Sequence, residues 1–120
     1  MFALVVRFDL QAGQGAAFDE LMARTLPAIR SDEPGTLVYV CCRIEGAPDA
    51  RLFMEIYADR TAFEQHERTP ATVRFLDERT GLIAASRVEF LTPYIFKLGC
   101  SEPGPTGLRA QSSEGADHGL

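Results

Sequence analysis

Lysine is almost absent from this sequence, since Lys97 is the only one, and the 12 Lys and Arg residues are outnumbered by 17 Asp and Glu. The formal net charge at pH 7 is −5, and no cluster of lysine and arginine interrupts the acidic balance. A surface that binds nucleic acid needs a basic patch to attract phosphates. The composition therefore argues against nucleic acid as a partner.

Long apolar runs are also missing. No segment of the chain approaches the roughly 18–20 apolar residues that a transmembrane helix needs, so we expect no membrane insertion. The opening stretch MFALVVRFDL alternates like a strand and is too short for the apolar region of a signal peptide. These absences predict a cytoplasmic protein.

Cysteine is infrequent and carries no recognisable spacing. Cys41 and Cys42 are adjacent, and neighbouring side chains of a strand point to opposite faces, so they cannot form an ordinary disulfide. Cys100 lies far along the chain. Unpatterned cysteines are typical of reduced thiols. Because CxxC, HxxxH and clustered His/Cys are all absent, the sequence predicts no metal site.

The chain is long enough for one domain. Its 120 residues are 46% apolar and 24% charged, which is ordinary for a globular protein with one modest core. We expect this domain to span residues 1–98. The remaining segment, 99–120, is rich in Gly, Ser, Pro and Ala and has little to bury, so we expect a disordered tail that includes His118.

Alternating and β-branched segments predict strands. They are 2–10, 36–44, 51–58 and a part of 82–96 that ends near Pro93. The stretch between the second and third strands, 45–50, has the length of a hairpin connection.

Apolar residues at helical spacing begin at Ala16. Pro27 should kink or end that first helix. A short helix over 60–66 follows Asp59 as its cap, and another begins at Pro70. The apolar positions of the first helix are Phe18, Leu21, Met22, Thr25 and Ile29, and those of the last are Val73, Leu76 and Thr80.

The element order β-α-β-β-α-α-β predicts a ferredoxin-like α+β fold, a four-stranded antiparallel sheet with helices on one face. Both faces of the strands 36–44 and 51–58 are largely apolar. The face without helices would then expose an apolar surface that needs a partner. We therefore expect a homodimer in which two sheets pack face to face.

The stretch EIYADRTAFEQHERTP, residues 55–70, gathers residues that can move protons. Glu55 lies in an apolar strand, where a buried carboxylate needs a partner such as Arg43 or Arg7. His66 is the only histidine before the tail. It is either a catalytic group or a polar residue that favours the end of a helix dipole.

Two segments, 32–43 and 53–70, resemble the antibiotic biosynthesis monooxygenase family. The spacings EPG-x-L-x-Y and E-x-Y-x-D-x-x-A-F-x-x-H-x-x-T-P carry the resemblance, which extends over about residues 2–96. It implies a dimeric α+β barrel and oxygen chemistry without flavin, metal or haem, hence no cofactor. The family's recurrent histidine falls on His66, and its strand glutamate and tyrosine fall on Glu55 and Tyr57.

The resemblance implies a small aromatic substrate, phenolic, quinol or polyketide-type, that reacts with O2. His66 would act as the general base, because its ordinary pKa lies near neutral pH, and Glu55 would orient the imidazole. The substrate-binding side chains are expected among aromatic residues and arginines. They are Tyr39, Tyr57, Phe63, Phe75, Arg7, Arg43 and Arg74, with Phe53 and Phe90 as further aromatic candidates.

Two departures from the family's pattern bear on activity. The chain has no tryptophan, whereas haem-degrading members use one to distort their cofactor, so haem degradation is not expected. Arg7 stands where catalytic members often place an asparagine. This keeps two alternatives open, a non-catalytic dimeric protein that binds a small ligand in the same pocket, and an isomerase in which His66 and Glu55 move a proton without oxygen.

Overall fold

The computed structural model describes residues 1–99, so of the expected tail only Gly99 is covered, and Cys100 and His118 lie outside the described part. The order of elements is the one that the sequence predicts. They are β1 (Phe2–Leu10), α1 (Gly15–Asp32), β2 (Thr36–Ile44), β3 (Ala47–Tyr57), α2 (Arg60–Arg68), α3 (Pro70–Glu78), the single 3₁₀ turn η1 (Arg79–Gly81) and β4 (Ile83–Leu91).

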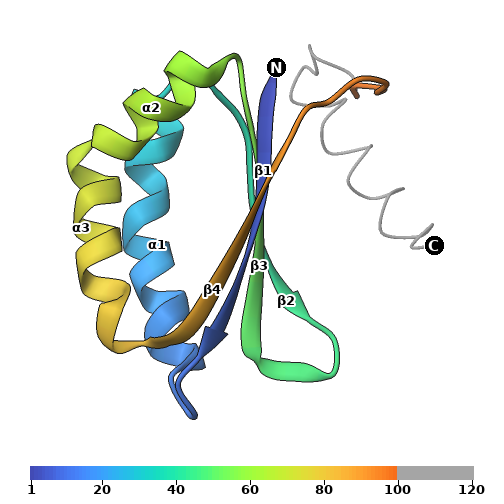
Figure 1. Cartoon of the computed structure of the whole chain (residues 1–120). Helices are drawn as coiled ribbons and strands as arrows, with labels where there is room; N and C mark the ends of the chain where they lie inside the picture. The colour runs from blue at the N-terminus through green and yellow to red at the C-terminus, as the bar shows by residue number, and fades with distance from the viewer. Residues whose placement is uncertain (100–120) are drawn as a thin grey trace, which may run out of the picture.

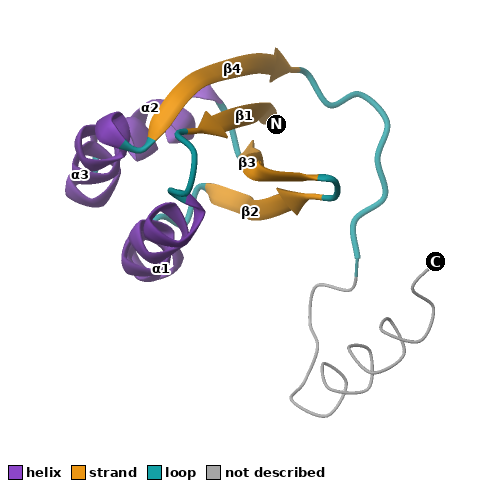
Figure 2. Ribbon diagram, turned by 90° about the horizontal axis from the view of Figure 1, so that it is seen from below, coloured by secondary structure: helices purple, strands orange, loops and turns teal. Residues whose placement is uncertain are grey.

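The strands form one open antiparallel sheet in the order β2-β3-β1-β4. Figure 1 shows the sheet almost edge-on, with all three α-helices on the same side. Figure 2, turned by 90°, shows α1 beside the β2 end of the layer and β4 at the opposite edge. The predicted ferredoxin-like layer is confirmed, and within one chain the sheet does not close into a barrel.

Aromatic side chains fill the space between the sheet and the helices. Phe8 of β1 lies with its ring centroid 5.4 Å from that of Phe18 in α1 and 5.0 Å from that of Phe53 in β3. Phe75 of α3 approaches the same group, with its centroid 6.3 Å from that of Phe53. Alternation in β1 and β3 puts these rings on the helix side, so the period-2 pattern of the sequence builds the core directly.

Helix α1 buries the five residues that its spacing predicts. It does not end at Pro27, however, and continues to Asp32. Pro27 is exposed, and the buried Ile29 one half-turn later keeps the chain helical against the lost backbone hydrogen bond. Within residues 1–99, no helix combines the length and apolar character needed to cross a lipid bilayer.

The β2–β3 hairpin is tighter than the sequence predicts. The prediction of a connecting loop over 45–50 is wrong, because β3 already begins at Ala47 and only Glu45 and Gly46 form the turn. Gly46, the second residue of this turn, has φ = 81°, whereas Glu45 has no positive φ; this left-handed second position matches a type II turn, and glycine adopts it without strain. The glycine therefore shortens the loop and extends the sheet.

Helix α3 turns a different face inward from the predicted one. Its buried residues are Ala71, Thr72 and Phe75, whereas Val73 is 52% exposed. Leu76 is half-buried and belongs to both faces. The reason is that Phe75 has more apolar surface to bury than Val73, so the helix is oriented with the Phe75 ring towards the core.

The sheet face opposite the helices carries apolar side chains, as expected. Val40, Met54 and Leu91 are 40%, 41% and 42% exposed on this face. Half-buried neighbours extend the surface. They are Val5, Val38, Leu52 and Ile56. We call this set of seven side chains the bare sheet face.

An ion pair between the buried Arg51 and the half-buried Asp19 joins α1 to β3. Arg51 donates from Nε to Asp19 Oδ1 at 2.8 Å and from Nη2 to Asp19 Oδ2 at 3.0 Å. Its Nη1 donates to the carbonyls of Pro48 and Ala50 at 3.0 and 2.8 Å. The Arg51 hydrogen bond lowers the pKa of the Asp19 carboxyl. Arg43 also reaches Asp19, at 2.9 Å, but its side chain is 77% exposed against 7% for Arg51.

These two arginines give a matched test of burial. Arg51→Met should lower the free energy of unfolding by about 2–3 kcal/mol, because it leaves Asp19 and two carbonyls without their buried donor. Arg43→Met should change it by less than about 0.5 kcal/mol, since exposed ion pairs contribute little. Urea unfolding followed by far-UV circular dichroism measures both. Equal effects of the two substitutions would contradict the assignment.

Candidate active site

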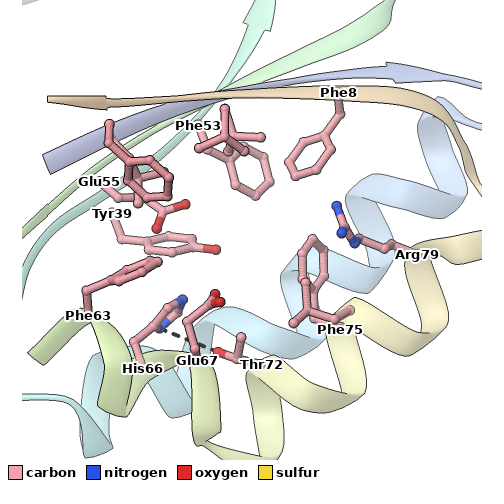
Figure 3. A pocket seen from close by; sticks show the side chains of 15 residues that line it. Phe8, Tyr39, Phe53, Glu55, Phe63, His66, Glu67, Thr72, Phe75 and Arg79 are labelled. Carbon is pink, nitrogen blue, oxygen red and sulfur yellow. Dashed lines mark hydrogen bonds between the residues drawn. The ribbon is translucent and has the colours of Figure 1, made fainter. Parts of the chain in front are cut away.

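A cavity of about 190 Å³ lies between the helix side of the sheet and helices α2 and α3. Its walls are mostly aromatic and aliphatic, with four side chains that can carry charge (Figure 3). The lining residues from the sheet are Leu4, Val6, Phe8, Tyr39, Phe53, Glu55, Val88 and Phe90, and those from the helical layer are Phe63, His66, Glu67, Thr72, Phe75, Leu76 and Arg79.

His66 is held by a buried carboxylate. Its Nδ1 lies 2.7 Å from Oε1 of Glu33, and the two side chains are only 4% and 5% exposed. The hydroxyl of Thr36 donates to the same Glu33 oxygen at 2.7 Å. The sequence led us to expect Glu55 in this role, but the partner of the imidazole is Glu33, which precedes β2.

Local chain geometry brings these two segments together. Asp59 caps α2 by accepting from the backbone N–H of Ala62 at 2.8 Å, which confirms the predicted cap. A Cβ added at Gly35 would stand 2.6 Å from the Cβ of Ala62, so only glycine lets α2 approach the turn this closely. That approach places His66, one turn further along α2, within hydrogen-bond distance of Glu33.

The pair fixes the tautomer of the imidazole. An ionised carboxylate can only accept, so Nδ1 must carry the hydrogen that it donates to Glu33. Nε2 then keeps its lone pair. Within residues 1–99, Nε2 makes no hydrogen bond. It is not one of the fully buried polar atoms that lack a hydrogen-bond partner. Figure 3 shows this edge of the ring directed into the cavity, between Tyr39 and Glu67. His66 thus presents a proton-accepting nitrogen to a bound ligand.

Glu55 enters the cavity from the opposite wall, on β3 (Figure 3). One of its oxygens accepts a hydrogen bond of 2.5 Å from the hydroxyl of Tyr57. Burial raises the pKa of the Glu55 carboxyl, against the opposing effects of the Tyr57 hydrogen bond and of His66. The partner expected from the sequence, Arg43 or Arg7, does not contact it. Glu55 therefore has Tyr57 as its structural partner and faces the cavity with its other oxygen.

The predicted aromatic platform is largely assembled. Tyr39, Phe63 and Phe75 line the cavity, together with Phe53 and Phe90. Tyr57 does not line it: the ring is fully buried behind Glu55, with its centroid 5.3 Å from that of His66. Burial raises the pKa of Tyr39 well above its ordinary value, so its hydroxyl stays protonated and can donate to a ligand.

None of the three arginines predicted for substrate binding reaches the cavity. Arg7 lies on the other side of the sheet and donates to Asp9 at 3.1 Å, Arg43 pairs with Asp19, and Arg74 is exposed on α3. The arginine in the cavity is Arg79, just after α3. Strand parity could have excluded Arg7, since it alternates with the buried Val6 and Phe8.

Sequence reasoning also missed Glu33, Glu67 and Thr72. Glu33 is the first residue of the EPG-x-L-x-Y spacing that carries the family resemblance, but no role was predicted for it. Thr72 was missed because the face predicted to point inward, with Val73, Leu76 and Thr80, does not contain it. The Thr72 hydroxyl lies 3.4 Å from His66 Nδ1 (Figure 3). In the part of the chain that the structure describes, no three His, Cys, Asp or Glu side chains are grouped as metal ligands.

Comparisons with known proteins agree with this architecture. The sequence profile described as antibiotic biosynthesis monooxygenase matches residues 1–78. A comparison with curated proteins finds no match. Among solved structures, a candidate antibiotic biosynthesis monooxygenase from Bacteroides thetaiotaomicron VPI-5482 has a TM-score of 0.76 at 20% identity, over 83% of this chain and 95% of that one.

Two further structures are similar. A candidate antibiotic biosynthesis monooxygenase from Caulobacter crescentus CB15 has a TM-score of 0.74 at 22% identity, over 78% of this chain and 90% of that one. One from Nitrosomonas europaea has a TM-score of 0.73 at 18% identity, over 79% of this chain and 100% of that one. At these identities the structural likeness shows the fold alone.

The raised pKa of Glu55 predicts a pH-dependent stability. The folded protein binds this proton more tightly than the unfolded chain, so stability is lost as pH rises from about 4.5 through the folded pKa. The loss is at most about 1.4 kcal/mol per pH unit for one proton. In Glu55→Gln, which keeps an oxygen for Tyr57 to donate to, this loss should disappear.

Urea unfolding at a series of pH values between about 4 and 8 tests this, with the exposed Glu64→Gln of α2 as the control. The control should keep the pH dependence of the native protein. An unchanged pH dependence in Glu55→Gln would show that this carboxyl does not titrate differently on folding.

Proposed function

This chain belongs to the antibiotic biosynthesis monooxygenase family, and on that premise we propose that it oxidises a phenolic, quinol or polyketide-type aromatic with O2. The proposal assigns the general base to His66. The observation that carries it is the Glu33–His66 pair, 2.7 Å apart and buried at the wall of an aromatic cavity. Glu33 is a positioning residue in this scheme, because it acts through His66.

The first step is the loss of a proton from the substrate hydroxyl to His66 Nε2. The imidazolium that forms stays beside the Glu33 carboxylate, which offsets its charge inside a buried site. Removing the proton makes the aromatic ring electron-rich. A general base placed in this way contributes about 10²–10⁴-fold to a rate.

The second step needs no cofactor in our proposal. The substrate anion passes one electron to O2, and the resulting radical and superoxide combine to form a C–O bond. His66 returns its proton to the peroxide, and the distal hydroxyl leaves as water with the ring hydrogen. One oxygen atom of O2 thus enters the ring as a carbonyl, the other becomes water, and the substrate hydroxyl becomes the second carbonyl of a quinone.

The cavity supports a small substrate. An apolar cavity of about 150 Å³ accepts one benzene ring, so about 190 Å³ suits one substituted ring or a compact pair of rings. Tyr39, Phe63 and Phe75 provide ring faces and edges for an aromatic ligand. The protonated Tyr39 hydroxyl and Glu55 can hydrogen-bond a substrate oxygen.

Oxygen uptake tests the proposal. On a panel of one-ring and two-ring phenols and hydroquinones, corrected for autoxidation, the native protein should consume O2. His66→Gln should lower kcat/KM by about 10²-fold or more, and Glu33→Gln by about 10–100-fold. The exposed neighbour Gln65→Ala should keep the native rate.

The double variant Glu33→Gln/His66→Gln removes the buried carboxylate together with the imidazole, which guards against a fold lost to an unpaired buried carboxylate. A double variant that is folded but inactive, together with an active Gln65→Ala variant, would support His66 as the general base. Full turnover in a folded His66→Gln would overturn it. Turnover without O2 consumption would favour an isomerase, and binding without turnover would favour a ligand-binding protein.

We also propose that two copies associate through the bare sheet face. Its exposed apolar side chains, with Met54 near the middle, form the kind of patch that monomeric proteins rarely leave in water. Packing two such sheets face to face would bury both patches by a twofold axis.

Sedimentation velocity tests the association. The native protein should sediment with twice the chain mass of 13.2 kDa. Met54→Lys should weaken the dimer by about tenfold or more, because it places a charge in the contact. Val73→Lys changes an equally apolar, 52% exposed side chain on α3 and should leave the mass unchanged. A monomeric native protein would refute the dimer.

A further inference from the structure

Arg79 is a cation built into the cavity wall. It follows α3 directly, and its guanidinium carbon lies 5.3 Å from the ring centroid of Phe8 and 5.9 Å from that of Phe75. Figure 3 shows the guanidinium directed into the cavity from the end opposite His66. Rings on two sides hold the side chain in place, so its position does not depend on an ion pair.

Arg79 has no acidic partner among residues 1–99. Its side chain makes no hydrogen bond or ion pair there, although five other arginines each pair with a carboxylate. Glu67 and Glu55 face the same cavity, but neither lies within 4 Å of a nitrogen of Arg79. The arginines that are paired are Arg7, Arg24, Arg43, Arg51 and Arg87.

A half-buried guanidinium without an anion costs free energy, because its charge has lost part of its hydration. Burial accordingly lowers the pKa of Arg79. A ligand anion would restore what the protein leaves unpaired. Guanidinium binds a carboxylate through two parallel N–H···O bonds, and the Phe8 and Phe75 rings beside Arg79 offer its N–H groups no acceptor oxygen that would compete with such a ligand.

We propose that Arg79 binds a carboxylate carried by the substrate's aromatic ring, so that the substrate class is hydroxyaromatic carboxylates. The ring would lie among the cavity aromatics, with its carboxylate at Arg79 and its hydroxyl at His66. A volume of about 190 Å³ accommodates one ring with both groups. The orientation of the hydroxyl rests on the proposed function, whereas the anion subsite itself does not.

Isothermal titration calorimetry under nitrogen tests the subsite without turnover. The probes are the three hydroxybenzoate isomers and the matching hydroxybenzamides, which have the same shape without the charge. At least one hydroxybenzoate should bind about tenfold or more tightly than its amide. Arg79→Gln should remove that difference, and Arg79→Lys, which keeps the charge without the fork, should reduce it.

The exposed Arg74→Gln on the same helix is the matched control and should bind like the native protein. Glu67→Gln should strengthen carboxylate binding, since it removes a negative charge from the lining of the same cavity. Equal affinity for acid and amide, an unchanged preference in Arg79→Gln, or no binding of any probe would each overturn the subsite.

The two proposals fail separately. Charge-selective binding without oxygen uptake would leave the subsite standing and remove the monooxygenase. Oxygen uptake that is equal for neutral quinols and for carboxylates, and that survives Arg79→Gln, would leave the monooxygenase standing and remove the subsite.

Discussion

The buried contact between Glu33 and His66 determines how the helical layer meets the sheet. It joins the turn before β2 to the last turn of α2, two segments that are distant in the sequence. Breaking it would leave a carboxylate in a site that is only 5% exposed, a cost that few single interactions in a small domain can offset. The close approach of Gly35 to Ala62, which is possible because glycine has no Cβ, permits the contact between Glu33 and His66. This contact determines the position of α2, the tautomer of the imidazole and the shape of the cavity.

Most of the fold could be predicted because its elements obey their periods. Alternation placed Phe8 and Phe53 on one side of the sheet, and the helical spacing of α1 named its buried residues. The errors arose where local rules compete with burial. Helix α1 continues past Pro27 because the residues after it, such as Ile29, are buried against the core. Helix α3 buries Phe75 although Val73 and Leu76 form a second apolar stripe on the same helix. Periodicity gives the faces of an element but does not decide which one meets the core.

The site was predictable in part for a related reason. His66 and Glu55 lie in one stretch of sequence, and they meet the same cavity from opposite walls. The partner of His66 is 33 positions away, and a pairing of that range depends on tertiary structure rather than on spacing. Among many arginines, only packing distinguishes Arg79, which is half-buried, from exposed ones such as Arg74. Side-chain type suggests the chemistry, while the folded arrangement selects the residues.

The distribution of charge limits what the cavity can do. A base in an apolar site accepts a proton readily only if the new charge is compensated, and in the proposed mechanism Glu33, 2.7 Å from His66, would provide that compensation. Glu55 adds no second negative charge when it is protonated, a state that its burial favours by raising its pKa. The substrate anion would therefore form beside a neutralised pair, with the cation of Arg79 at the far end. In the proposed mechanism, charge separation across one aromatic ring would be supported at both of its ends, which is the electrostatic condition for making an electron-rich anion in a largely apolar cavity.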